Sequence, residues 1–260
     1  MQKFEQELGA TEDRDFVASL EKGLAVIEAF DAESPRLTLT DVAKRTGITR
    51  AAARRYLKTL TKLSYADFDG RYFSLSPRIL RLGYAYLASS SLSTRVQPFL
   101  EKISAQTGES SSAAILDGDE IVYIARSATQ RIMSVSLGVG TRLPAYCTSL
   151  GRAILAFQPE DVLEAYLKRV RLEPRTLKTI TRKPDLRAAL ETVRQEGCAL
   201  IDEELELGLR SIAVPLVQAN GPVRIALNIG TQAARVPLAE MKTRFLPPLL
   251  EATETLHGIL

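Results

Sequence analysis

The sequence TLTDVAKRTGITRAAARRYLKTLTKL, residues 38–63, decides the fold of the N-terminal part of the chain. It predicts two short helices joined by a tight turn. Thr38 and Asp41 have the spacing of a capping box, which starts the first helix. Gly47 ends that helix, because glycine readily adopts the left-handed backbone that follows a helix. Thr49 is placed to cap the second helix. The pattern is that of a helix-turn-helix.

The second predicted helix has one apolar face and one basic face. Ala53, Leu57 and Leu60 recur with helical periodicity and predict the buried side. The opposite side carries basic groups and a hydroxyl, at Arg50, Arg54, Lys58 and Thr61, and Arg55 and Lys62 lie at its margin. Most basic helix faces simply meet water, but a basic second helix is also what a helix-turn-helix inserts into a DNA major groove.

Residues 65–75 predict a β-hairpin directly after the helix pair. Asp69-Gly70 lies between two strand-forming runs, which is a strong hairpin signal. A helix-turn-helix followed by a hairpin is a winged helix, and Arg71 at the hairpin tip is placed to touch phosphate or the minor groove. The hairpin would equally serve to close a small core.

Charge is distributed unevenly along the chain. Residues 36–81 contain 11 Lys/Arg and 3 Asp/Glu, a net charge of 11 − 3 = +8, whereas the whole chain carries +3, so the remainder sums to 3 − 8 = −5. A basic module provides the sequence-independent attraction to phosphate that a DNA-binding protein needs. The chain therefore combines a basic module with a larger, mildly acidic one.

We predict an α+β protein with four segments: a loose N-terminus (1–15), a winged helix-turn-helix (16–77), a linker helix (78–91) and a second domain (92–260). In the second domain, predicted hairpins alternate with helices, which indicates a sheet covered by helices. Leu80, Tyr84 and Leu87 form an apolar stripe on the linker helix, suited to a dimer contact or to packing on its own winged domain.

Composition narrows the class of protein further. The chain is 45% hydrophobic, contains two cysteines, and has no apolar run that approaches membrane-spanning length. A disulfide framework is not expected from two cysteines, and no signal pattern begins the chain. We expect a cytoplasmic protein with no membrane partner.

Residues 147–153, CTSLGRA, are the first candidate site for a small molecule. Hydroxyl groups and a glycine at a predicted helix start leave backbone N–H groups that attract anions. Simple N-capping by Thr148 or Ser149 explains the same pattern.

Residues 201–212 are the second candidate. An acidic cluster leads through Gly208 into a predicted strand. Asp202 and Ser211 lie at strand ends, where side chains can turn into a pocket. We expect the other acidic residues of this loop to be solvated, namely Glu203, Glu204 and Glu206.

Catalysis is not expected. The single histidine is His257, near the C-terminus, and Cys147 has no histidine near it in the sequence. Metal-ligand spacing and a phosphate-binding glycine loop are both missing from the sequence. We therefore expect no cofactor and no metal. The alternative, a ligand-processing enzyme with a fused winged helix, needs an acid/base pair, for which only Asp202 is a candidate. A DNA-binding structural protein without a ligand is a third possibility.

The sequence resembles the IclR family of bacterial transcription regulators over nearly its whole length. The stretches that carry the resemblance are SLEKGLAVIEAF (19–30), LTLTDVAKRTGITRAAARRYLKTL (37–60), DGRYFSLSPRILRLG (69–83), SLGRAILA (149–156) and DEELELGLRSIAVPL (202–216). LGYAYL (82–87), DGDEIVYIAR (117–126) and RIMSVSLGVGTRLPAY (131–146) are similar, more narrowly, to the branch that controls protocatechuate, 4-hydroxybenzoate and β-ketoadipate catabolism.

The resemblance implies a winged helix joined to a GAF-like effector-binding domain, acting as a dimer or a dimer of dimers on a palindromic operator. It implies a small aromatic or dicarboxylic acid as effector. The residues expected at the DNA are Thr38, Thr49, Arg50, Ala51, Arg54, Arg55, Lys58 and Arg71. The family's pocket positions fall on Met133, Val135, Ser149, Leu150, Gly151, Asp202, Ser211, Asn228 and Gly230. We expect the effector's carboxylate at the amides of residues 149–151, with Asn228 or Ser211 orienting its hydroxyl or keto group.

Overall fold

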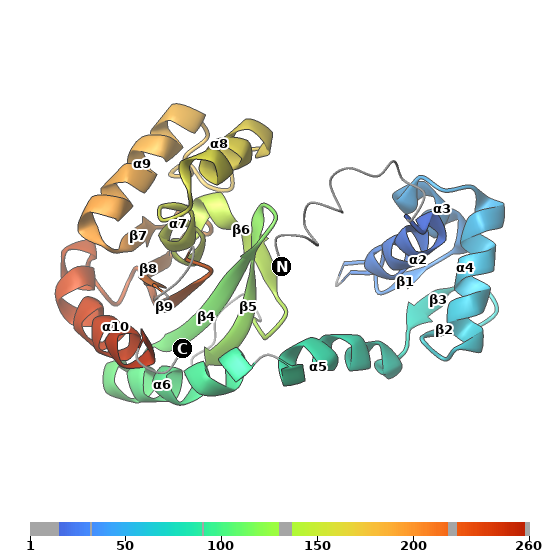
Figure 1. Cartoon of the computed structure of the whole chain (residues 1–260), viewed down its shortest axis with the longest axis horizontal. Helices are drawn as coiled ribbons and strands as arrows, with labels where there is room; N and C mark the ends of the chain where they lie inside the picture. Colours follow the sequence, from blue (N-terminus) through green and yellow to red (C-terminus); the bar gives the residue numbers. More distant parts are fainter. Residues whose placement is uncertain (1–15, 32, 90, 130–136, 218–222, 258–260) are drawn as a thin grey trace, which may run out of the picture. The chain divides into compact units, whose positions relative to one another are not determined.

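The computed structural model describes residues 16–31, 33–89, 91–129, 137–217 and 223–257 (Figure 1). The chain divides into two compact units, Met1–Ala85 and Tyr86–Leu260. Helix α5 (Leu80–Ser89) contains the boundary between them. No helix in the described ranges is long and apolar enough to cross a bilayer.

The first unit is a winged helix-turn-helix. Its helices are α2 (Ala18–Glu28), α3 (Leu39–Thr46) and α4 (Arg50–Lys62), followed by the short 3-10 helix η1 (Pro77–Ile79). Its antiparallel sheet has the order β1-β3-β2, with β1 (Arg36–Leu37), β2 (Ala66–Phe68) and β3 (Phe73–Leu75). The core gathers apolar side chains from the three helices and from β1 and β3, including Val26, Leu37, Val42, Ala53, Leu57 and Phe73.

The predicted helix caps are confirmed. Thr38 Oγ1 accepts a hydrogen bond from the Asp41 N–H at 3.3 Å, and the Asp41 carboxylate accepts one from the Thr38 N–H at 2.9 Å, which completes the capping box. Gly47 adopts the left-handed conformation with φ of 68°. Thr49 Oγ1 accepts from the Ala52 N–H at 3.2 Å and begins α4.

The predicted hairpin is confirmed with shorter strands. Phe68 pairs with Phe73, so four residues, not two, form the loop between β2 and β3. Arg71 and Tyr72, expected in the second strand, lie in this loop. The Asp69 carboxylate accepts their backbone N–H groups at 2.9 and 2.7 Å, which holds the loop closed and removes these residues from the ladder.

The second unit is a six-stranded antiparallel sheet between two layers of helices. The strand order is β6-β5-β4-β9-β8-β7. The strands are β4 (Ser110–Asp117), β5 (Glu120–Ser127), β6 (Arg142–Pro144), β7 (Ala199–Asp202), β8 (Leu209–Leu216) and β9 (Ile225–Gln232).

Helices α6 (Ser91–Thr107) and α10 (Met241–His257) cover one face of the sheet. The other face carries α7 (Ser149–Leu155), α8 (Glu160–Arg169) and α9 (Lys183–Glu196) (Figure 1). Two 3-10 helices, η2 (Ala145–Cys147) and η3 (Leu238–Glu240), precede α7 and α10. Each face has its own apolar core, so the sheet is buried on both sides.

Two predictions for the second unit compare differently with the structure. The sequence predicts a helix over residues 96–107, but helix α6 begins earlier, at Ser91, and Leu92 and Val96 pack into the core under α6 and α10. The sequence also predicts a strand over residues 132–137, which falls almost entirely outside the described residues. Strand β6 has no counterpart among the predicted elements.

Helix α7 is buried along its whole length and is held by an internal ion pair. The Arg152 guanidinium meets the Glu204 carboxylate at two points, with Nη1–Oε1 of 2.8 Å and Nη2–Oε2 of 2.5 Å. Arg152 Nε donates to the Tyr146 carbonyl at 2.7 Å. The expectation that Glu204 is solvated is therefore wrong, because an arginine 52 residues away in sequence pairs with it in the core.

We expect Glu204→Ala to lower the free energy of unfolding of the second unit by about 3–5 kcal/mol, because it leaves the Arg152 charge buried and unpaired. The matched control is Glu160→Ala, which removes an exposed ion pair with Arg187 and costs about 1 kcal/mol or less. Urea unfolding followed by circular dichroism measures both. Equal losses in the two variants would contradict the structural role of the buried pair.

Candidate functional site

The exposed side of α4 presents a row of cations. Arg50, Arg54, Arg55 and Lys58 are exposed, while Ala53 and Leu57 on the opposite side are fully buried. Within the described part of the chain, no ion pair or side-chain hydrogen bond engages these four cations. Ala51 and Thr49 are also exposed at the start of the helix. The row is therefore available to an anionic partner.

In other residues of the first unit, hydrogen bonds, ring contacts or ion pairs already engage the polar groups. The Thr38 hydroxyl donates to the Asp41 carboxylate at 2.6 Å, so it serves the cap of α3. Arg71 lies exposed in the wing loop, with its guanidinium 5.1 Å from the centre of the Tyr72 ring. By contrast, Arg36 pairs with Asp69 and is not part of the free row.

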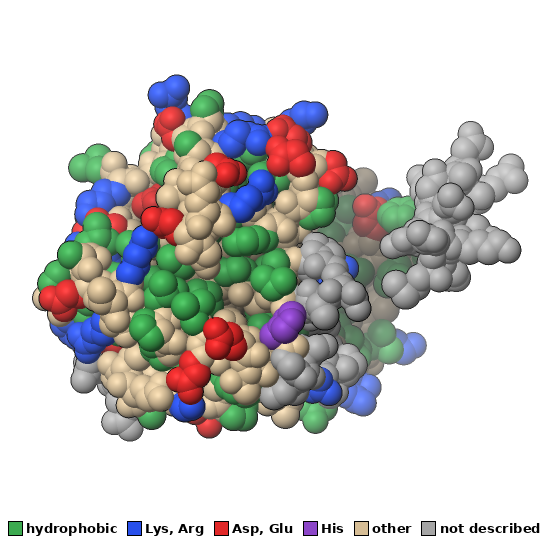
Figure 2. All heavy atoms as spheres, turned by 60° about the vertical axis from the view of Figure 1, so that its left-hand side comes forward, with side chains coloured by type: hydrophobic (Ala, Val, Ile, Leu, Met, Phe, Trp, Pro, Cys, Tyr) green, Lys and Arg blue, Asp and Glu red, His purple; other side chains and the backbone are tan. Residues whose placement is uncertain are grey.

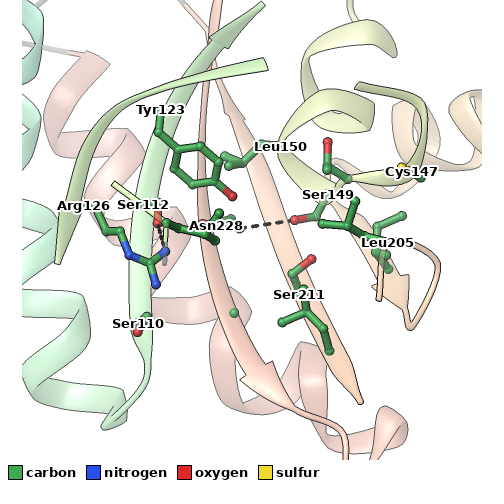
Figure 3. A pocket seen from close by; sticks show the side chains of 15 residues that line it. Ser110, Ser112, Tyr123, Arg126, Cys147, Ser149, Leu150, Leu205, Ser211 and Asn228 are labelled. Carbon is green, nitrogen blue, oxygen red and sulfur yellow. Dashed lines mark hydrogen bonds between the residues drawn. The ribbon is translucent and has the colours of Figure 1, made fainter. Parts of the chain in front are cut away.

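The second unit contains a cavity of about 40 Å³ between the start of α7 and the face of the sheet (Figure 3). This is room for about one water molecule. Apolar side chains and a set of hydroxyl, amide and guanidinium groups line it. The lining residues are Ser110, Ser112, Tyr123, Arg126, Leu137, Cys147, Thr148, Ser149, Leu150, Ile201, Leu205, Leu209, Ser211, Asn228 and Gly230.

Three polar residues of the lining lie in one row across the centre of the sheet. Arg126 on β5 pairs with Ser112 on β4, and Ser112 pairs with Asn228 on β9. Arg126 Nη1 donates to Ser112 Oγ at 3.1 Å. Asn228 Nδ2 lies 3.5 Å from Ser149 Oγ, which connects the sheet to α7 (Figure 3). The strand register thus places a guanidinium and an amide on one face of the sheet.

A β-bulge brings Tyr123 and Arg126 to the same face. The pairing of β4 with β5 shifts register between Ala113 and Ala114, so that Ala113 pairs with Ala125 and Ala114 with Tyr123. Ile124 is the additional residue, and its side chain packs with the α6 and α10 core. In a regular strand, side chains three positions apart point to opposite faces, whereas a bulge redirects them.

Two polar atoms of the lining residues are buried and have no hydrogen-bond partner among the described residues. They are Arg126 Nε and Asn228 Oδ1. Burial lowers the pKa of the Arg126 guanidinium and raises the pKa of Tyr123 to about 12. Buried polar atoms are nearly always paired in folded proteins, so a water, a ligand or a residue outside the described ones is expected to pair with these two atoms.

The structure brings together five of the nine residues expected in the pocket. Ser149, Leu150, Ser211, Asn228 and Gly230 line the cavity. Met133 and Val135 lie outside the described residues.

Gly151 and Asp202 do not line the cavity. A Cβ at Gly151 would lie 2.2 Å from the Ala145 carbonyl oxygen, so this glycine permits close packing of α7. Its N–H donates to Thr148 Oγ1 at 3.2 Å, as simple N-capping predicts. The Asp202 carboxylate accepts from Lys178 Nζ at 2.6 Å and from Arg210 Nε at 2.5 Å.

Sequence reasoning missed Tyr123, Arg126, Ser110 and Ser112 as lining residues. Arg126 ends the segment DGDEIVYIAR, but the bulge that turns it into the cavity has no signal in that segment.

Cys147 is not a candidate nucleophile. Burial raises the pKa of its thiol to about 11, so it is protonated at neutral pH. His257 lies at the end of α10, with Nδ1 2.6 Å from the Val217 carbonyl oxygen. Among the described residues, no group of histidine, cysteine and carboxylate side chains has the arrangement of a metal site.

Comparison with known proteins agrees with this architecture. The family model for the IclR helix-turn-helix domain matches residues 19–70, and the model for the bacterial transcriptional regulator IclR C-terminal domain matches residues 84–257. The Pca regulon regulatory protein of Pseudomonas putida is 50% identical over 247 residues, which cover 95% of this chain and 85% of the relative. The p-hydroxybenzoate hydroxylase transcriptional activator of Acinetobacter baylyi is 40% identical, covering 95% and 93%.

Solved structures show the same relationship. An IclR family transcriptional regulator from Brucella abortus is 27% identical with a TM-score of 0.81, covering 95% of this chain and 94% of that one. The inducer binding domain of the Acinetobacter PobR transcription factor is 34% identical with a TM-score of 0.61, covering 66% and 100%. The chain therefore belongs to the IclR family of DNA-binding transcriptional regulators, in the branch of the Pca and p-hydroxybenzoate regulators, and is not an enzyme.

Proposed function

We propose that this regulator reads its operator with α4 and the wing and is controlled by a small organic acid bound in the cavity of the second unit. The DNA-binding half rests on the row of exposed cations on α4, which have no ion-pair partner among the described residues. The effector half rests on the two buried polar atoms of the cavity lining that have no hydrogen-bond partner in the described part of the chain.

In this proposal α4 enters the major groove. Arg50, Arg54 and Lys58 face the base edges, where arginine can read guanine through two hydrogen bonds. Thr49 and Arg71 contact phosphates and set the register on the duplex. Of the remaining expected residues, Ala51 and Arg55 are exposed on α4, and Thr38 caps α3.

The charge of the two units supports the assignment. The view of the second unit in Figure 2 shows acidic and basic side chains mixed over one face. The segment 36–81, by contrast, has a net charge of +8. Attraction to phosphate is therefore concentrated in the first unit.

Changing Arg54→Ala is expected to weaken operator binding by about 1–3 kcal/mol and to relax sequence preference at one base pair, because a direct base contact is lost. Mobility-shift titration on operator and random duplex measures both effects. Lys22→Ala on α2 is the matched control, since it removes the same charge from an exposed site outside the helix pair. Identical binding by Arg54→Ala and the wild type would refute the groove assignment.

The proposed effector is a small aromatic or dicarboxylic acid. The Acinetobacter inducer binding domain was solved, as a double mutant, in complex with 3-hydroxybenzoic acid. The cavity of this chain combines apolar walls with a guanidinium, an amide and hydroxyls, which suits a ring or short chain bearing polar ends. A cavity of about 150 Å³ can hold benzene, so we expect such a ligand to widen the cavity of about 40 Å³.

This expansion offers a physical basis for control. A ligand shifts a conformational equilibrium only by binding one state more tightly than the other. An acid that fits the expanded cavity favours the conformation with the wider cavity. By linkage, the operator must then bind the two arrangements with different affinity if the acid is to control transcription.

We expect at least one of protocatechuate, 4-hydroxybenzoate and β-ketoadipate to raise the unfolding temperature, because a ligand at a hundredfold excess over its Kd stabilises by about 2.7 kcal/mol. A thermal-shift screen over ligand concentration measures this. Benzyl alcohol is the control for nonspecific apolar binding. An unchanged unfolding temperature with all three acids would contradict control by this class of effector. Product analysis after incubation of the protein with each of the three acids should show no turnover of the acid.

We also propose that the chain forms a homodimer, or a dimer of dimers, on a palindromic operator in the bacterial cytoplasm. Large apolar side chains are exposed in the first unit, on α2 at Leu20 and Leu24 and on α5 at Leu80 and Tyr84. Tyr84 is 71% exposed and Leu80 is 70% exposed. An exposed apolar stripe of this kind on two helices is typical of a subunit contact, and a twofold operator matches a twofold protein.

The double change Leu80→Glu and Tyr84→Glu is expected to shift the protein from dimer to monomer, because two carboxylates cannot be buried unpaired in an apolar contact. Size-exclusion chromatography with light scattering measures the mass. Leu177→Glu is the control, since this leucine is fully exposed in the second unit. A variant that stays dimeric would place the contact elsewhere.

A further inference from the structure

We propose that Arg126 binds the carboxylate of the effector and that Asn228 accepts a hydrogen bond from a hydroxyl group at its other end. The cavity would then select a small hydroxylated carboxylic acid, because one residue binds its carboxylate and the other binds its hydroxyl group. This inference rests on the proposed control by a small acid and identifies the residues and the class of ligand.

Arg126 is the anchor for an anion because it is the one charged side chain among the described residues that line the cavity. Its Nη1 donates to Ser112 Oγ at 3.1 Å, which fixes the guanidinium in place. Its Nε is buried and has no hydrogen-bond partner among the described residues. A guanidinium offers donors in a planar fork that matches the two oxygens of a carboxylate. An anion at Nε would therefore satisfy the free donor and compensate for the buried charge.

The start of helix α7 at Ser149, where the sequence places the carboxylate, is a weaker carboxylate site than Arg126. Helix α7 has only seven residues, and Thr148 caps it. The Gly151 N–H already donates to Thr148 Oγ1, and Gly151 itself packs against Ala145. Arg126, on the β5 side of the cavity, is therefore the better hydrogen-bond donor for the carboxylate.

Asn228 recognises the other end of the ligand. The residue is 7% exposed, and Nδ2 lies 3.5 Å from Ser149 Oγ. Oδ1 has no partner among the described residues. An amide oxygen only accepts hydrogen bonds, so the complementary group is a hydroxyl and not a ketone. Figure 3 shows Asn228 between Arg126 on one side and Ser149 on the other.

The sheet itself sets the spacing between the two groups. Arg126 and Asn228 are cross-strand neighbours of the same residue, Ser112. They are therefore two strand spacings apart, about 10 Å between Cα atoms, with both side chains on one face. Apolar walls lie around the row, at Leu137, Leu150, Ile201, Leu205 and Leu209. The arrangement suits one ring or short chain with a carboxylate and a hydroxyl at opposite ends.

The test uses the full-length protein and calorimetric titration with three probes: 4-hydroxybenzoate, its neutral analogue 4-hydroxybenzamide, and benzoate, which lacks the hydroxyl. We expect the wild type to prefer 4-hydroxybenzoate over the amide by about tenfold or more, the size of one charge-assisted hydrogen bond. Arg126→Gln should bind acid and amide equally, whereas Arg126→Lys should keep part of the preference for the acid.

Asn228→Ala is the complementary variant. It should lose the preference for 4-hydroxybenzoate over benzoate and keep the preference for the acid over the amide. Arg244→Gln, which removes an exposed arginine on α10, is the control and should titrate like the wild type. Arg126→Gln should unfold at the same temperature as the wild type or above it, because it removes a buried charge with an unmet donor.

The outcomes separate this inference from the proposed function. Suppose that the wild type binds 4-hydroxybenzoate and that Arg126→Gln prefers the acid over the amide as strongly as the wild type does. Arg126 is then not the anchor of the carboxylate. If the glutamine variant does not fold, Arg126→Lys takes its place in this comparison. If the wild type binds only β-ketoadipate in the thermal-shift screen, the proposed control by a small acid is supported. The inference that Arg126 and Asn228 bind the two ends of a hydroxy acid is then overturned. If no acid binds, both are overturned.

Discussion

The buried ion pair between Arg152 and Glu204 is the constraint on which the second unit depends. Arg152 is 4% exposed and Glu204 is 8% exposed, so the two charges meet in the core, away from water. Such a pair is tolerated only with good geometry and satisfied donors. Here two guanidinium nitrogens meet two carboxylate oxygens, and Nε is taken by the Tyr146 carbonyl. The pair fixes α7 to the loop between β7 and β8, and the cavity lies beside this junction.

The sheet provides the other wall of the cavity through its register. Ser112 stands between Arg126 and Asn228 on neighbouring strands, and the bulge at Ile124 turns Tyr123 toward the same side. A strand slipped by one residue would send all of these groups into the opposite core. Strand β4 therefore has two tasks: it pairs with β5 and β9, and it aligns the polar row. The apolar residues of the other face, packed by α6 and α10, keep this register in place.

The two units carry different kinds of chemistry. The first has exposed cations on a helix capped by Thr49, with no ion-pair partner among the described residues, which suits a polyanion that arrives from solution. The second has buried polar atoms that lack a partner in the described ranges, which suits a small molecule that supplies the missing hydrogen bonds. Coupling between them requires two conformations that each ligand binds with different affinity. The proposed ring-sized effector needs more room than the cavity of about 40 Å³ provides.

Local sequence determined the first unit almost completely. The caps at Thr38 and Thr49, the stop at Gly47 and the hairpin around Asp69 were all predictable, because each depends on side chains within three residues of the backbone groups they satisfy. The basic and apolar faces of α4 were also predictable, since helical periodicity alone sets them. Family resemblance added the architecture of the second unit and five residues that line its cavity.

Tertiary structure decided the rest. Glu204 looked like a solvated loop residue until Arg152, distant in sequence, was found to pair with it. Asp202 looked like a pocket residue, but Lys178 and Arg210 occupy its carboxylate. Arg126 enters the cavity because of a bulge in the pairing of β4 with β5. Each of these outcomes depends on contacts between segments far apart in the chain, and a pattern read along one segment contains no information about the partner that folding brings to it.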